Sequence, residues 1–458
     1  MTGINKTIMT AFLLAVFLAA GPFPCPGTEA SFEYAPLVPL PKYYNLAEQG
    51  KKPAVRSQGE LGTCWAISAC SAIESALLPE QEYSFSPDHM SLSNGYDSLQ
   101  EDGGDYYMIM SYLADWKGPV NESDDPYGDG VSPEGLTASV HVGDIRFMRG
   151  MSQQRIKQMI LSYGAAQSSL SMDRVRTDNE EYHYYNEVAS AYYDPFVEKL
   201  NHDILILGWD DRYPAENFLI RPRRDGAWIC QNTWGEDFGE DGIFYVSYED
   251  RNLFRKGGLV YSDINAAAEG EKVYEQDSLG WLGRQGYGSE ECWFAGVFEA
   301  EQAESVTGIG FYTTGPYTAY RILLIPDYTD REDLARAAGE AGNQCPEDTA
   351  GNELLSGSQT RILAAGQIAN PGFHTVAIPG EVNLRKGQRY AVAVWVDTPG
   401  ESKPAAVELA KDRYTQSVTT KGRETYLSRT GASWENTQEV YQTNVCMKVF
   451  TRDKELYG

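Results

Sequence analysis

The stretch QGELGTCWAIS, residues 58–68, constrains the fold more than any other, because it joins a polar, glycine-containing segment to a run of small apolar residues. Small and apolar residues then recur at helical spacing, at positions 66, 69, 70, 73, 76 and 77. This pattern predicts a closely packed helix with Thr63 as its N-cap. Cys64 would then lie in the first helical turn. A thiol there is either a nucleophile, whose thiolate the helix dipole stabilises, or a small core residue.

The rest of the first 260 residues changes from helical to strand patterning. Two further helices are predicted within residues 103–116 and 152–164. A helical lobe followed by a β-rich lobe, with a cleft between them, is therefore expected for this α+β part of the chain. The strand-like runs fall within residues 203–210, 217–222, 227–232 and 242–250.

Beyond about residue 265 the pattern is strongly β. Residues 265–272, NAAAEGEK, are typical of a linker. Residues 389–397, RYAVAVWVD, alternate between two faces as a strand does, and residues 319–326 and 373–379 behave similarly. These runs, separated by glycine and proline, predict an all-β sandwich of antiparallel strands.

The N-terminus has the pattern of a secretory signal peptide. Lys6 precedes an apolar run over residues 8–21, which is short for a membrane span. We expect cleavage between Ala30 and Ser31, with a site nearer Ala20 or an uncleaved anchor as alternatives. No later segment is apolar enough to cross a membrane, so the mature chain is expected to be exported. The predicted division is residues 1–30, 31–264 and 265–458.

The charge balance excludes some classes of partner. The chain has 38 Lys and Arg against 65 Asp and Glu, a net charge of −27. Such a surface repels phosphate backbones and anionic lipid headgroups, so neither nucleic acid nor a membrane surface is expected as the main partner. A hydrophobic fraction of 42% is ample for packed cores. We also expect the protein to be a monomer.

The seven cysteines are scattered and form no C-x-x-C pairs, which argues against a zinc site or a dense disulfide framework. Neither a metal nor an organic cofactor is expected. Cys292, Cys345 and Cys446 lie in the C-terminal part, where export would permit a disulfide. Because three is an odd number, at least one of them is free or pairs elsewhere.

A nucleophilic Cys64 would need a base and a group to orient that base. His202 begins the strand-like run HDILILGWDD, which would hold an imidazole rigidly at a strand end. Asn232 ends another such run, and its amide could orient the imidazole. Gln58 and the backbone N–H of Cys64 could stabilise a developing oxyanion. The other histidines, with less chemical context, are His89, His141, His183 and His374.

These residues together resemble the papain family of cysteine peptidases, over nearly all of residues 38–250. The family pattern Gln-x-x-x-x-x-Cys-Trp-Ala is met from Gln58 to Ala66. Its Asn-His strand is met by Asn201 and His202, and its Asn-Ser-Trp-Gly motif by NTWG, which begins at Asn232. The spacing from cysteine to histidine lies in the family's range of roughly 130–150 residues, and the asparagine lies somewhat beyond it.

The resemblance implies roles for each of these residues. Cys64 would be the nucleophile, His202 the general base and acid, and Asn232 the group that orients His202. Gln58 would be the oxyanion donor. The implied fold is a two-lobed peptidase with a helical lobe and a β-barrel-like lobe, acting on protein or peptide substrates.

Further residues are implied on the substrate side of the site. Gly103 and Gly104, in EDGGDYY, resemble the family's backbone-lined substrate strip. Trp234 would shield the pair of His202 and Asn232, and Asn201 would border the substrate. The segments LPKYYNL, VYEQDSLGW and GFHTVAI resemble a bacterial, secreted branch in which a lectin-like domain follows the peptidase. Glycans are therefore possible ligands of that domain.

The chain departs from the family pattern at several points. Leu61 stands where many members carry a disulfide-bonded cysteine, and Asp203 follows the histidine where a small apolar residue is usual. Asp203 could raise the pKa of His202, form a structural hydrogen bond or point to water. Only about thirty residues separate the predicted cleavage site from Cys64, so the family's long inhibitory pro-segment is not expected.

Two other functions remain as alternatives. The chain could be a surface adhesin or glycan-binding protein with a peptidase-like scaffold, although such inactive relatives usually lose the cysteine or histidine. The second alternative is acyl transfer to an amine, as in transglutaminase-like enzymes, which also use a cysteine nucleophile and a histidine. Those enzymes usually orient the histidine with a carboxylate, so Asn232 weighs against this alternative.

Overall fold

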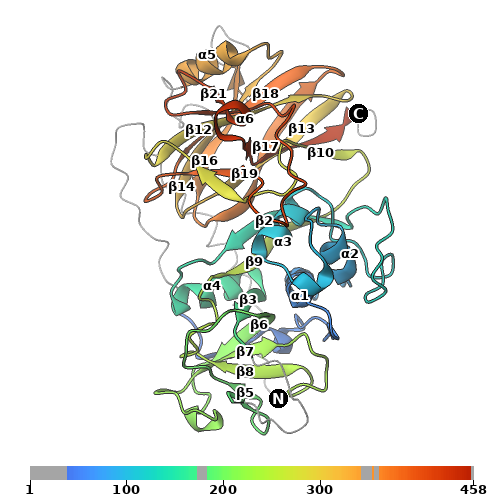
Figure 1. Ribbon diagram of the computed structural model, residues 1–458, viewed down its shortest axis with the longest axis vertical. Helices are drawn as coiled ribbons and strands as arrows, with labels where there is room; N and C mark the ends of the chain where they lie inside the picture. Colours follow the sequence, from blue (N-terminus) through green and yellow to red (C-terminus); the bar gives the residue numbers. More distant parts are fainter. Residues whose placement is uncertain (1–38, 173–182, 342–352, 355–359, 455–458) are drawn as a thin grey trace, which may run out of the picture.

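The computed structural model describes residues 39–172, 183–341, 353–354 and 360–454. Figure 1 shows two parts along the long axis of the molecule, the C-terminal β domain above and the strands β6, β7 and β8 below. The strand β2 and the helix α3 lie between these parts. The α+β fold class and the order of the two domains are confirmed. The signal peptide predicted over residues 1–30 lies outside the described residues.

The helices of the N-terminal part confirm the periodicity of the sequence. The helix predicted after Thr63 begins at Cys64, but the Thr63 side chain does not cap it. The Thr63 hydroxyl instead forms a 2.5 Å hydrogen bond with the hydroxyl of Tyr127. The helices are η1 (Leu46–Gln49), α1 (Cys64–Leu77), α2 (Pro87–Leu92), η2 (Gln100–Asp102), α3 (Tyr106–Ala114), α4 (Gln153–Tyr163) and η3 (Ala215–Asn217).

The strands of this part form an open sheet and not a closed barrel, in the order β2-β9-β3-β6-β7-β8-β5-β4. Three of the four predicted strands are present, but residues 217–222 form the end of η3 and an irregular segment, so that prediction was wrong. The strands are β1 (Tyr43–Asn45), β2 (Val140–Phe147), β3 (Ala166–Leu170), β4 (Tyr185–Asn186), β5 (Ala191–Tyr192), β6 (His202–Asp210), β7 (Ala227–Gln231), β8 (Ile243–Ser247) and β9 (Gly258–Ala266).

The C-terminal domain is the predicted sandwich. Its first sheet continues from the N-terminal part through β17, and its second has the order β15-β16-β14-β18-β12-β20-β21. Its elements are β10 (Glu271–Glu275), β11 (Gly283–Gln285), β12 (Glu291–Glu299), β13 (Glu304–Thr313), β14 (Thr318–Ile325), α5 (Arg331–Ala341), β15 (Glu353–Leu354), β16 (Arg361–Ile368), β17 (Gly372–Leu384), β18 (Arg389–Asp397), β19 (Ala405–Glu408), β20 (Thr425–Ser428), β21 (Glu435–Asn436), α6 (Thr437–Tyr441), β22 (Asn444–Val445) and β23 (Met447–Asp453).

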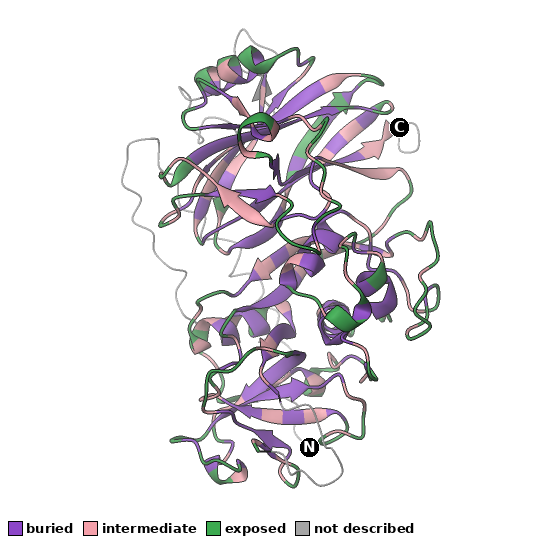
Figure 2. Cartoon of the chain, in the orientation of Figure 1, coloured by how far each residue is buried: buried purple, intermediate pink, exposed green. Residues whose placement is uncertain are grey.

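Residues 389–397 form β18, and the predicted alternation is present, with both faces of the strand buried. Tyr390, Val392 and Val394 belong to the core between the two sheets. Ala391 and Ala393 belong to a second core, which includes residues of α5. Figure 2 shows how buried residues run along the strands of the sandwich. The domain therefore has hydrophobic layers on both sides of its second sheet.

The two parts of the chain share one sheet. β17 of the C-terminal domain pairs antiparallel with β2, with His374 opposite Asp144, and their side chains form a 2.9 Å ion pair. β2 in turn pairs with β9. Half of the predicted linker over residues 265–272 lies in strands, because only residues 267–270 separate β9 from β10. The predicted division after residue 264 falls inside β9.

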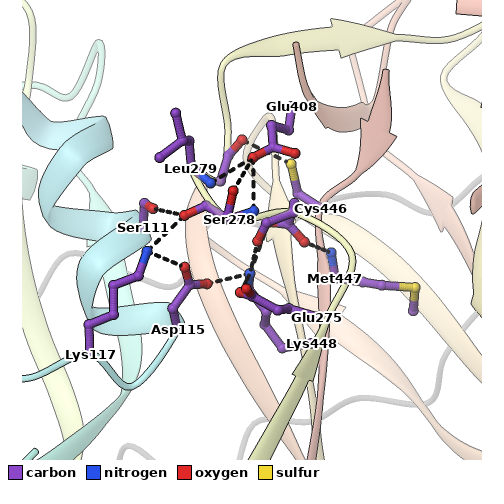
Figure 3. A network of polar contacts seen from close by, with 12 residues as sticks. Ser111, Asp115, Lys117, Glu275, Ser278, Leu279, Glu408, Cys446, Met447 and Lys448 are labelled. Carbon is purple, nitrogen blue, oxygen red and sulfur yellow. Dashed lines mark hydrogen bonds and ion pairs between the residues drawn. The ribbon is translucent and has the colours of Figure 1, made fainter. Parts of the chain in front are cut away.

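A buried cation reinforces this junction. Lys448 of β23 is fully buried and forms ion pairs with Asp115, at the end of α3, and with Glu275 and Asp277 at 2.9 and 3.1 Å. Figure 3 shows Asp115 and Lys117, just after the end of α3, facing Lys448 and Glu275. Burial opposes the charge of Lys448, but the three carboxylates outweigh it and raise the pKa of Lys448. Lys448 therefore links the end of α3 to the C-terminal domain from a fully buried position.

Among the described residues, no cysteine forms the disulfide that export would permit. Cys292 and Cys446 are buried, and neither is disulfide-bonded among the described residues. Cys345 lies outside those residues. Burial raises the pKa of the Cys292 thiol to about 12, so it remains protonated as a core residue.

We predict that Lys448→Met strongly destabilises the chain. The substitution keeps the apolar stem but leaves Asp277 buried without a cation and Asp115 with Lys117 alone, and breaking a buried pair in this way costs about 3–5 kcal/mol. Urea unfolding would measure the loss in the free energy of unfolding. Lys454→Met is the matched control, because Lys454 is partly exposed and lies 3.9 Å from Glu381, so its loss should cost at most about 1 kcal/mol. Equal stability of the two variants would contradict the prediction.

Candidate active site

Cys64 and His202 line the same cavity, which has a volume of about 600 Å³. Cys64 is the first residue of α1 and His202 the first residue of β6, and the two elements pack against each other. Only 7% of Cys64 and 4% of His202 is exposed, so the cavity gives access to just a small part of each side chain. The cysteine and histidine that the sequence singled out are therefore brought together.

The orientation of His202 follows from its hydrogen bond to Asn232. The His202 Nε2 atom lies 2.7 Å from Asn232 Oδ1, which also accepts a 2.8 Å hydrogen bond from the backbone N–H of Thr233. The backbone N–H can only donate, so the amide atom between these groups is the oxygen. His202 Nε2 must then carry a hydrogen. The ring presents Nδ1 on its other side, where it can take up or release a proton.

Trp234 contacts the His202 ring, whereas Gln58 contacts Thr233, the residue after Asn232. The ring of Trp234, itself half-buried, lies with its centroid 4.7 Å from that of the His202 ring, a position compatible with the predicted shield. Gln58 is buried beside the strand end, where Nε2 donates to the Leu61 carbonyl and Oε1 accepts from the Thr233 hydroxyl. Gln58 does not line the cavity.

Gly103 and Gly104 line the cavity beside Trp65, as the sequence predicted for a substrate strip. A Cβ atom on Gly104 would lie 2.3 Å from the Trp65 ring, so only glycine permits this approach. Asn201 also lines the cavity, but its side-chain amide is engaged with the backbone of Met172 at both ends, each at 2.8 Å. Asn201 therefore anchors the chain that leads into His202.

Gln167 was missed by sequence reasoning, yet it links the two halves of the site. Its Nε2 donates to the carbonyl of Trp65, next to Cys64, and to the carboxylate of Asp203, next to His202, at 3.0 and 2.8 Å. Its Oε1 accepts from Tyr261. Gln167 is fully buried, and burial also raises the pKa of Asp203. Of the three possibilities for Asp203, the structure shows a structural hydrogen bond and not a solvated carboxylate.

The C-terminal domain contacts the segment that carries Gly103 and Gly104, which the sequence did not reveal. Arg413 forms a 2.8 Å ion pair with Asp102, which directly precedes Gly103 and lines the cavity. Trp281 packs edge-to-face on Tyr107, another lining residue, with the ring centroids 5.5 Å apart. The strip is therefore held between the two domains. No motif signalled these contacts, since they join residues far apart in the sequence.

The remaining described histidines lie outside the cavity. His89 forms a 2.7 Å hydrogen bond with the hydroxyl of Tyr112, and His141 stacks on Trp116 at 3.7 Å. His374 is the partner of Asp144 described above. Within the described ranges, no cluster of three His, Cys, Asp or Glu side chains is arranged to hold a metal ion. The cavity is therefore built around Cys64 and His202.

Comparison with known proteins agrees with this geometry. Residues 40–260 match the family model described as Papain family cysteine protease, and residues 273–451 match the model described as Lectin like domain. The chain combines a papain-family cysteine protease domain with a lectin-like domain. Cysteine proteinase 1 of Zea mays is 27% identical over 242 residues, which span 49% of this chain and 62% of the maize protein. The chain therefore covers less than two thirds of that relative.

Solved structures share the arrangement of both domains. The cysteine protease and lectin-like domains of Cwp84, a surface layer associated protein of Clostridium difficile, superpose with a TM-score of 0.73 at 22% identity. The match covers 91% of this chain and 90% of that one. Clostridial Cwp84 after propeptide cleavage gives the same TM-score at 23% identity, over 90% of this chain and 99% of that one. At this level of identity the likeness shows the fold.

We predict that Gln167→Leu lowers both stability and peptide hydrolysis. The change removes the amide donor of the buried Asp203 carboxylate, at a cost of about 1–3 kcal/mol. Urea unfolding and steady-state hydrolysis would measure the two effects. Adding Asp203→Ala removes the orphaned carboxylate, so the double variant should recover part of the lost stability. If Asp203→Ala gives no recovery, the hydrogen bond between Gln167 and Asp203 does not carry this energy.

Proposed function

We propose that this chain is a cysteine endopeptidase that hydrolyses peptide bonds through an acyl-enzyme on Cys64. The observation that carries the proposal is the shared cavity of Cys64, at the N-terminus of α1, and His202, which Asn232 orients. A helix N-terminus stabilises a thiolate, and an oriented imidazole can accept and return its proton. The family match of residues 40–260 supports the same reaction.

The proposed reaction uses side chains that line this cavity, the backbone N–H of Cys64 and the Gln58 side chain beside it. The Cys64 thiolate attacks the carbonyl carbon, and the negative charge moves onto the carbonyl oxygen. The backbone N–H of Cys64 and the Gln58 amide are the proposed oxyanion donors. The imidazolium of His202 gives its proton from Nδ1 to the departing amine, which leaves a thioester on Cys64. His202 then takes a proton from water, whose attack releases the acid and frees the thiolate.

We also infer that the enzyme acts outside the cell or at its surface. The signal-like N-terminus supports this, and the Cwp84 neighbour is described as a surface layer associated protein. No helix in the described part of the chain is long and apolar enough to cross a membrane. The substrates would be proteins or peptides, and the lectin-like domain is a candidate site for glycans. The adhesin alternative gains no support from the comparisons.

We predict that Cys64→Ala abolishes peptide hydrolysis and leaves the fold intact, because the substitution removes the nucleophile and changes little volume. Cys70→Ala is the matched control on the same helix, since burial raises the pKa of the Cys70 thiol and keeps it out of reach of substrate. Hydrolysis of a quenched fluorescent peptide would be measured beside the circular dichroism of each variant. Activity retained by Cys64→Ala would refute the assignment.

Asn232→Ala should lower kcat while leaving Cys64 in place. His202 would lose the acceptor for its Nε2–H, so the ring could rotate away from its working position. We expect a fall of about 10- to 100-fold, a part of the roughly 10²–10⁴-fold that a positioned acid–base group contributes. Asn232→Asp retains an oxygen acceptor and should recover part of the rate. An unchanged kcat in Asn232→Ala would show that His202 is oriented by other contacts.

A further inference from the structure

The cavity has two walls of different origin. One wall is the segment from Glu101 to Tyr107, which includes the glycine strip. The other is one edge of the sheet β2-β9-β3-β6, where β2 ends at Phe147, β9 begins at Gly258 and β6 begins at His202. Neighbouring strands of this sheet are antiparallel. The end of one strand therefore lies beside the beginning of the next at this edge. Residues just beyond these ends are therefore brought together, although they are distant in sequence.

Four cations occupy this sheet-edge wall. Arg149 follows β2, Lys199 precedes β6, and Arg255 and Lys256 precede β9, and all four line the cavity with exposed side chains. Within the described ranges none of them has a carboxylate within ion-pair distance. Arg255 donates only to the backbone carbonyl of Glu198. In a chain with a net charge of −27, these four side chains form a local cluster of positive charge, in which Lys256 also interacts electrostatically with Asp105.

The carboxylates that line the cavity are mostly engaged. Asp102 is paired with Arg413, and Asp203 is buried against Gln167. Asp105 caps α3 by accepting hydrogen bonds from the backbone N–H groups of Tyr107 and Met108. Glu101, exposed on the glycine-strip wall, is the one lining carboxylate for which no such contact is found among the described residues. Hydrogen bonds from neutral donors leave the charges of Asp105 and Asp203 in place, so the positive charge is concentrated on the sheet-edge wall and is not the net charge of the whole cleft.

We propose that the cleft selects peptides that carry an aspartate or glutamate within a few residues of the cut bond. The acidic side chain would lie toward the wall of Arg149, Lys199, Arg255 and Lys256, while the peptide backbone runs along Gly103 and Gly104. This inference rests on the proposed peptidase function and adds its substrate class. Opposite charges placed across a binding site favour the correct partner over an otherwise identical neutral one.

The test compares peptides that differ only by Asp against Asn, with the substitution scanned through each position around the cut bond. Because each exposed ion pair contributes only a small preference, two or three cations together should favour the Asp peptide by about 5- to 20-fold in kcat/KM at low salt. In 1 M salt the Debye length falls to about 3 Å, and the preference should shrink.

A double variant, Arg149→Gln with Lys256→Gln, should remove most of this preference. Lys421→Gln is the matched control, because Lys421 is an exposed lysine of the C-terminal domain that does not line the cavity. The control should keep the full ratio between the Asp and Asn peptides. A ratio near one in the unmodified chain, or a ratio that survives the double variant, would overturn the inference.

The same assay separates this inference from the proposed function. Cleavage of the Asn peptides without any preference would retain the peptidase and reject the acidic specificity. If no peptide is cleaved, the proposed function fails, and binding of labelled Asp and Asn peptides to the Cys64→Ala chain decides the specificity by fluorescence anisotropy. Equal affinity of the two peptides would then reject the cationic wall as a selecting element.

Discussion

The site depends on one buried amide. Gln167 donates to the carbonyl of the residue after Cys64 and to the carboxylate of the residue after His202. The nucleophile and the base lie on separate elements, α1 and β6, so their relative position depends on contacts between those elements. A fully buried hydrogen bond resists rearrangement, because breaking it would leave polar atoms without water or a partner. Asp203, which departs from the family pattern, thereby helps to fix the relative position of α1 and β6.

The C-terminal domain also helps to position the site. One sheet runs from β10 through β17 and β2 to β6, so the strand that begins with His202 belongs to the same hydrogen-bonded array as the lectin-like domain. Lys448 binds carboxylates from both parts at their junction, and Arg413 holds Asp102 beside the glycine strip. These contacts make the cleft a product of both domains. Loosening the junction should therefore alter the cleft along with stability.

Much of the fold could be predicted because its signals are local. The helix at Cys64 and the strand of residues 389–397 follow from periodicity within a few turns or residues. The errors arose where local signals conflict with packing. Residues 217–222 are apolar enough for a strand but have no strand to pair with among the described residues, and Leu219 stays exposed. Thr63 occupies the predicted cap position, yet its hydroxyl contacts Tyr127 instead of the helix.

By itself, the sequence determined the candidate nucleophile, base and orienting amide, since each lies in a short motif at the end of a periodic element. It also determined the order of a helical lobe, a β lobe and a β sandwich. Only the tertiary structure decided that Gln167 joins the halves of the site, that Arg413 supports the strip and that four cations gather on one wall. Those contacts connect loops and strand ends far apart in the chain. Loops carry no periodic pattern, so their meeting is set by how strands pair and domains pack.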